Sequence, residues 1–132
     1  MQSAAEIVEL GRKARNAGNI ADALKFYNAA VEAFESEGDP VKAEHSRRHS
    51  ADLQLELGQI DEARESIGKV IAYYRANGTG TLEMGNTLRI AALVEAAAGD
   101  TETARGFWVE TLARYEEVGV QAGIDEVRRR LA

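Results

Sequence analysis

The sequence contains no cysteine and only one proline among its 132 residues. The absence of cysteine excludes disulfide frameworks, thiolate nucleophiles and thiolate zinc sites. Long hydrophobic runs are also missing, since no segment approaches the roughly 20 apolar residues that a membrane span needs. No segment alternates polar and apolar residues as half-buried strands do. The expected fold class is therefore all-α.

Basic residues are also fewer than acidic ones. The 22 acidic residues outnumber the 16 lysines and arginines, which gives a net charge of −6. Nucleic acid and anionic membranes attract proteins with a positive field, so neither is an expected partner. Residues 1–16 show no apolar core followed by a cleavage signal, and a cytoplasmic location is the expected one.

Glycine, by contrast, is abundant, with twelve residues in a chain that otherwise looks helical. Six of the twelve glycines form two sets of three with a regular spacing. Within the first set, successive glycines are 40 and 41 residues apart, and each glycine of the second set follows one of the first set after 20 residues. The first set is Gly18, Gly58 and Gly99, and the second set is Gly38, Gly78 and Gly119. This self-similarity predicts three repeated units.

The segment between the two glycines of each unit has the spacing of an amphipathic helix. Apolar residues recur in steps of four, four and three residues, which follows the helical period. Each stripe ends on an aromatic residue (Phe34, Tyr74 or Tyr115), and these residues and Trp108 are expected in the core. The second glycine suits a left-handed C-terminal cap.

The segments before the first glycines are predicted to be helices too. Ser3 with Glu6 fits a capping box, Asp39 before Pro40 fits an N-cap, and a third start is expected within 78–81. After Gly119 the apolar spacing predicts a seventh helix, whose last turn carries three arginines at 128–130.

The predicted architecture is a right-handed α-α superhelix of three helical hairpins with a C-terminal capping helix. It is expected to form a single domain over residues 1–132, with repeats at about 3–38, 39–78 and 79–119 and the capping helix at about 120–131. Gly68 and Gly106 fall inside predicted helices, where a mild loss of stability competes with close packing as an explanation.

Small and large residues in the first unit resemble the tetratricopeptide repeat (TPR). The matching residues are Leu10-Gly11, Ala14, Gly18-Asn19, Ala23, Tyr27 and Ala30. The other two units resemble the TPR more loosely. Gly11 and Ala30 of the first unit correspond to Ala51 and Val70 in the second unit, and to Ala92 and Thr111 in the third. The period of about 40 residues resembles the long-repeat variants found in kinesin light chain and in bacterial peptide-sensing regulators.

Arg47 departs from this pattern, because the equivalent residues in the other units are the apolar Ile7 and Leu88. Either Arg47 buries its stem and extends its charged end to the surface, or its helix is rotated or exposed.

The resemblance implies a concave groove, lined by the first helix of each hairpin, that takes a partner peptide. The groove residues projected from helical spacing are Arg12, Arg15, His45, Arg48, Asp52, Asn86 and Arg89. Arg48 and Arg89 are in register, so they are expected side by side, with Arg12 nearby. Guanidinium groups suit carboxylates, which predicts an acidic peptide or a free C-terminus as the ligand. The alternative is that these arginines only solvate the helices or pair with Glu9, Asp52 or Glu56.

No reaction is predicted from the sequence. His45, His49 and Asp52 have a spacing that a metal site could use, but two neighbouring arginines would repel a cation, so no metal and no cofactor are expected. The predicted function is a protein–protein interaction module without enzyme activity. The alternative is a homo-oligomerising structural or regulatory domain, which would use the third hairpin or the last helix.

Overall fold

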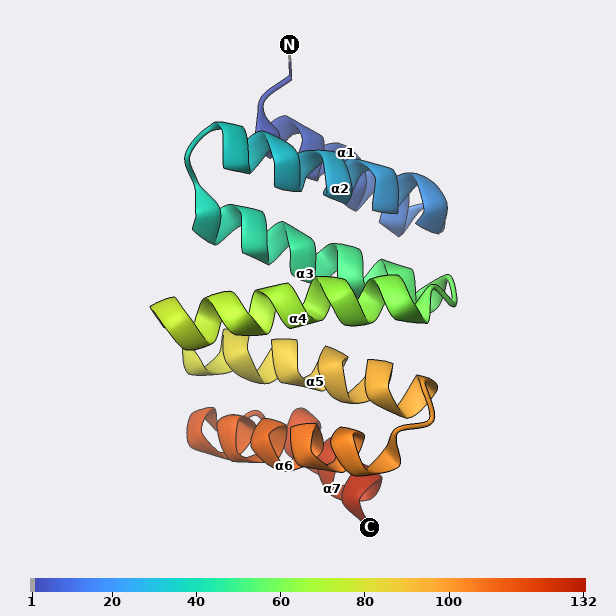
Figure 1. Ribbon diagram of the computed structural model, residues 1–132, viewed down its shortest axis with the longest axis vertical. Coiled ribbons are helices and arrows are strands. Elements are labelled where there is room, and N and C mark those ends of the chain that lie inside the picture. Colours follow the sequence, from blue (N-terminus) through green and yellow to red (C-terminus); the bar gives the residue numbers. More distant parts are fainter. Residues whose placement is uncertain (1) are drawn as a thin grey trace. The chain divides into compact units, whose positions relative to one another are not determined.

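The computed structural model describes residues 2–132, and within that range it contains seven α-helices and no strand (Figure 1). The all-α prediction and the number of helices are confirmed. The helices are α1 (Ala4–Asn16), α2 (Ile20–Ser36), α3 (Pro40–Glu56), α4 (Ile60–Asn77), α5 (Thr81–Ala97), α6 (Thr101–Val118) and α7 (Gln121–Leu131).

The helices belong to two compact units, one up to Val70 and one from Ile71 to Ala132, and the boundary lies within α4. In the first unit α1 packs against α2, and α2 against α3; in the second, α5 packs against α6, and α6 against α7. Figure 1 shows the pair α1 and α2 near the N-terminus and the pair α6 and α7 near the C-terminus. Each unit is described here by itself, so the right-handed superhelix and the single domain stay predictions.

The six repeated glycines end helices, as their spacing predicts. All six have φ between 74° and 85°, in the left-handed region that favours glycine. At Gly18 the N–H groups of Gly18 and Asn19 donate to the carbonyls of Arg15 and Ala14, at 3.0 and 2.9 Å, which is a Schellman motif. The same two bonds recur at Gly38, Gly58 and Gly99. Both sets of glycines therefore have the same structural role.

Two predicted helix starts are confirmed in detail. The Ser3 hydroxyl accepts from the Glu6 N–H, and the Glu6 carboxylate accepts from the Ser3 N–H, which completes the capping box. The Asp39 carboxylate accepts from the Lys42 N–H, with Pro40 in the first turn. The third start, within 78–81, has Gly80 as its N-cap and therefore no side-chain cap.

The apolar stripes of the paired helices form the core of each unit. Ala23, Tyr27 and Leu53 pack together in the first unit, and Trp108, Tyr115 and other residues of α6 pack with α7 in the second. The residues at the two repeat positions that Gly11 and Ala30 define are all buried, namely Gly11, Ala51 and Ala92 at the first and Ala30, Val70 and Thr111 at the second.

Gly11 is needed for close packing, whereas Gly68 and Gly106 are not. A Cβ atom on Gly11 would lie 3.0 Å from Cε2 of Tyr27, so α1 and α2 cross closely at this residue. Gly68 and Gly106 lie on exposed helix faces, and a Cβ atom there would meet nothing within 4 Å. For these two glycines the packing explanation is wrong, and the mild cost in stability is what remains.

Arg47 buries its stem. Its side chain is only 18% exposed, its Nε donates to Glu44 Oε2 at 3.2 Å, and its Nη2 lies 3.6 Å from Glu35 Oε2. The first of the two alternatives is therefore confirmed: α3 keeps its packed face, and the charged end is compensated by two carboxylates.

Candidate functional site

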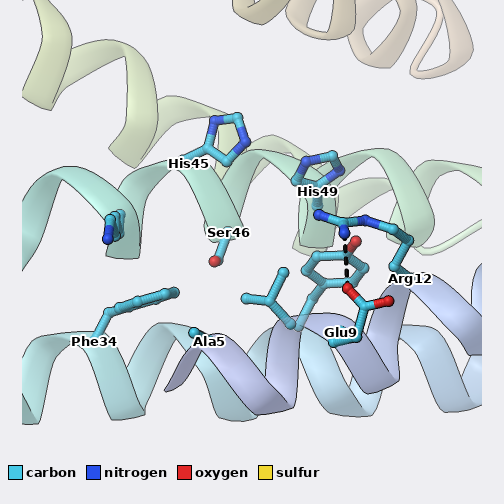
Figure 2. Close-up of a pocket in the computed structure, with 10 residues that line it drawn as sticks. Ala5, Glu9, Arg12, Phe34, His45, Ser46 and His49 are labelled. Atoms are coloured by element: carbon cyan, nitrogen blue, oxygen red, sulfur yellow. Dashed lines mark hydrogen bonds and ion pairs between the residues drawn. The ribbon is translucent and has the colours of Figure 1, made fainter. Parts of the chain in front are cut away.

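The first unit contains a pocket of about 400 Å³ between α1, α2 and α3 (Figure 2). Its lining residues are Ala5, Val8, Glu9, Arg12, Tyr27, Phe34, Lys42, His45, Ser46 and His49. Figure 2 shows Phe34 toward one end of the pocket, the pair Glu9 and Arg12 toward the other, and Ser46, His45 and His49 along α3. The pocket therefore lies on the face shared by the first helices of two successive hairpins.

The deeper part of the pocket is apolar. Tyr27 and Phe34 are 3% and 6% exposed, and Val8 packs against the cores around both of them. The Tyr27 ring can lie this close to α1 because residue 11 has no side chain. An apolar side chain of a ligand would find aromatic and aliphatic contacts here.

The outer part of the pocket carries positive charge. Arg12 pairs with Glu9 at 2.7 Å and is 59% exposed, and Lys42 is 3.9 Å from Asp39 and 68% exposed. Such exposed pairs hold their partners weakly, so both cations can exchange them for a ligand carboxylate.

His49 forms the wall of the pocket over Tyr27. Its ring stacks on Tyr27 with centroids 4.8 Å apart, and the His45 ring meets it edge-on at 5.0 Å. Burial, followed by the charge of Arg48, lowers the pKa of His49 to about 4. The imidazole is therefore neutral at pH 7. Its Nδ1 lies 3.4 Å from the Arg15 guanidinium, which can only donate, so Nδ1 accepts.

Arg15 and Asp52 were predicted as groove residues, but they pair with each other. The Arg15 Nη2 donates to Asp52 Oδ2 at 2.6 Å and lies 3.8 Å from Glu56 Oε2. Neither residue lines the pocket. Their contact joins α1 to α3 beside it, which is the pairing alternative that the sequence left open.

Asn86 and Arg89 lie in the second unit, where α7 engages both α5 and α6. Arg89 binds Glu126 through two hydrogen bonds, Nε to Oε1 at 2.7 Å and Nη2 to Oε2 at 2.8 Å. These bonds hold the pKa of Glu126 below its usual value. The Asn86 Oδ1 accepts from the Tyr115 hydroxyl at 2.8 Å. Both predicted groove residues therefore have partners inside the protein.

Of the predicted residues, Arg12 and His45 line the pocket together. Arg48 is half-buried on α3 and does not line it. Arg48 and Arg89 belong to different units, so their expected proximity stays a prediction.

Sequence reasoning missed Lys42 and assigned Tyr27 and Phe34 to the core alone. The signal for Lys42 was present, because it precedes His45 by three residues and His49 by seven, which places all three on one helix face.

Across residues 2–132 no cluster of three or more histidine, aspartate or glutamate side chains could hold a metal ion. Among the same residues, every helix is too short or too polar to cross a bilayer.

Comparison with known families gives one match. The family model described as soluble NSF attachment protein, SNAP, matches residues 1–122, which include the first unit and the second unit up to the start of α7. None of the curated proteins compared with the chain matches it.

Proposed function

The chain belongs to the soluble NSF attachment protein (SNAP) family, and from this premise we propose that its first unit binds a partner peptide on the α1–α3 face. The family is one of TPR-like helical repeats that act as protein-binding adaptors. The narrower assignment to the long-repeat TPR variants, the absence of catalysis and the cytoplasmic location are part of the same proposal.

One observation carries the proposal: the pocket combines an apolar floor with exposed cations at its mouth. A volume of about 400 Å³ accommodates one or two side chains of a peptide. Val8, Tyr27 and Phe34 would contact an aliphatic or aromatic anchor. Arg12 and Lys42 would bind carboxylates beside that anchor, which favours an acidic peptide.

The remaining predicted groove residues have supporting roles in this proposal. Arg15 and Asp52 fix the spacing of α1 and α3 through their ion pair, and His49 holds the Tyr27 ring by stacking. His45 and Arg48 extend the surface along α3. Asn86 and Arg89 belong to the second unit, where a groove surface of their own would require them to exchange their present partners, Tyr115 and Glu126.

The test is selection from a displayed peptide library, followed by fluorescence polarisation with the selected peptide. We expect enrichment of an apolar residue flanked by aspartate or glutamate. The double variant Arg12→Glu, Lys42→Glu should weaken binding about tenfold or more, because two attractive charges become repulsive. The variant Ala5→Leu should weaken it as well, by filling the pocket without changing its charge.

The matched control is Lys25→Glu with Lys69→Glu, two exposed lysines of the same unit that do not line the pocket. Equal losses in both double variants would mean that only net charge matters, and the proposal would fail. If no peptide is selected and light scattering shows a mass that grows with concentration, the homo-oligomeric alternative is favoured instead.

A further inference from the structure

We propose that a second cavity of the first unit, between α2, α3 and α4, binds the ammonium group of a lysine side chain from a protein partner. The cavity has a volume of about 290 Å³ and shares no residue with the peptide pocket, so this inference does not depend on the proposed function. Its lining residues are Asn28, Val31, Glu32, Glu35, Arg47, Ser50 and Ser66.

The Ser50 hydroxyl has hydrogen-bonding capacity that no other group within the described chain uses. The residue is only 1% exposed, and its hydroxyl is the one deeply buried side-chain polar group of residues 2–132 that has no hydrogen-bond partner. A buried hydroxyl without a partner is costly, so a group that enters the cavity and binds Ser50 is favoured. This observation is independent of the charges around the cavity.

The cavity offers acceptor oxygens to a ligand. The Ser66 hydroxyl donates to Gln54 Oε1 at 2.8 Å, which leaves its oxygen able to accept. Within the described chain, the side chains of Asn28 and Glu32 take part in no hydrogen bond or ion pair, so the Asn28 amide oxygen and the Glu32 carboxylate can also accept. Arg47 directs its Nε to Glu44 and its Nη2 to Glu35. A ligand that donates several N–H groups therefore finds partners here.

The charge of the cavity also favours a cation. Two glutamates, Glu32 and Glu35, line the cavity beside one cation, Arg47, and the Arg47 guanidinium is shared between Glu35 and Glu44. The carboxylate of Glu32 is left without compensation from within the unit.

A lysine side chain matches both the acceptor oxygens and the apolar wall of the cavity. Its compact ammonium group has three N–H donors for the hydroxyl and carboxylate oxygens, and its methylene stem can lie along Val31, which is buried at the cavity wall. A lysine side chain that another protein presents can enter this cavity, so the α2–α4 side is a second interaction surface in this proposal.

The test is a titration of the ¹⁵N-labelled protein with Nα-acetyl-lysine methylamide, followed by NMR. We expect saturable shifts of the Asn28, Ser50 and Ser66 amides. The Nε-acetylated probe should bind at least about tenfold more weakly, because acetylation removes the charge and two N–H donors. Glu32→Gln should weaken binding about fivefold or more, whereas Glu117→Gln, the same change on exposed α6, should not.

Ser50→Ala provides a second measurement that does not depend on charge. It should weaken the lysine probe while leaving the helical spectrum intact, since it removes an unpartnered hydroxyl rather than a packed group. Equal binding of the two lysine probes, no saturable shift, or full affinity in Ser50→Ala would overturn the proposal and leave water as the occupant. Cadaverine binding as tightly as the lysine probe would overturn the assignment to a protein partner, because a free diamine would then suffice.

Discussion

The two units differ in the helix face that lies between the first helix of a hairpin and the helix that follows the hairpin. In the first unit the face shared by α1 and α3 remains open as a pocket. In the second unit α7 closes the face of α5, with Arg89 bound to Glu126 and Asn86 bound to Tyr115. The difference shows how a terminal helix can satisfy the residues that an open face would offer to a ligand.

Tyrosine rings pack against glycines in both units, Tyr27 against Gly11 and Tyr115 against Gly85. The two tyrosines occupy different places in their repeats, nine residues after Gly18 and sixteen residues after Gly99. The other side of the Tyr27 ring meets the imidazole of His49 on α3, and the other side of the Tyr115 ring meets Gly123 on α7. The absence of a side chain at Gly123 lets the α7 backbone come against its ring, whereas the His49 side chain keeps the α3 backbone away from Tyr27.

The largest expected effect is a difference in acid sensitivity between the units. The pKa of His49 is about 4 in the folded protein and about 6.5 in an unfolded chain. Between these values the unfolded state binds a proton that the folded state does not. The free energy of unfolding of the first unit should therefore decrease by about 3 kcal/mol as the pH falls from 6.5 to about 4. The second unit contains no histidine.

Amide hydrogen exchange, converted to opening free energies at several pH values, measures this loss for each unit separately. The variant His49→Phe keeps the stack on Tyr27 and should remove the slope from the first unit. Equal slopes in both units, or a slope that His49→Phe leaves unchanged, would contradict the assignment.

The second largest effect is expected from a substitution of Gly123, which should lower the stability of the second unit. A Cβ atom there would lie 2.6 Å from Cδ2 of Tyr115, and the ring cannot retreat because Gly85 and Asn86 hold its other side and its hydroxyl. Gly123→Ala should therefore destabilise the second unit by about 2 kcal/mol. Urea denaturation followed by the fluorescence of Trp108, the only tryptophan, measures the change. An unaltered midpoint would show that α7 does not depend on this contact.

Breaking the ion pair between α5 and α7 should have a smaller effect. Glu126→Gln removes the charge that Arg89 binds, and because Arg89 is 35% exposed, solvent screening limits the loss to about 1 kcal/mol at pH 7. The lowered pKa of Glu126 means that this contribution is complete above the usual glutamate pKa and disappears as the pH falls through the lower, folded value. Wild type and variant should thus converge in strong acid. Glu117→Gln is the control, and a constant difference at all pH values would argue against the charge.

The sequence was sufficient to predict the helices because their signals are local. Six glycines, the Ser3 capping box and the Asp39-Pro40 start each act within a few residues, and all are confirmed. Gly11 and Arg47 could be interpreted because the repeat shows which residues occupy the equivalent positions in the other units.

The candidate site was predicted less completely because it depends on contacts between distant segments. Arg15 and Arg89 were predicted to face a groove, but each binds a carboxylate 37 residues away. Helical spacing predicts the face of the helix on which a charged residue lies, but it does not predict which residue of another helix packs against that face. The same spacing would have identified Lys42, whereas the dual role of Tyr27 in core and pocket requires the structure.

The smallest expected effect is one that the two units should share. Gly68 lies on α4 in the first unit and Gly106 on α6 in the second, and a Cβ atom on either meets nothing within 4 Å. Since alanine costs less conformational entropy than glycine in a helix, Gly68→Ala and Gly106→Ala should each stabilise the protein by about 0.5 to 1 kcal/mol. Urea denaturation measures both variants under the same conditions as Gly123→Ala. A loss of stability at either position would contradict the open space beside that glycine, and the opposite signs at Gly106 and Gly123 would separate backbone entropy from the close contact that α7 requires.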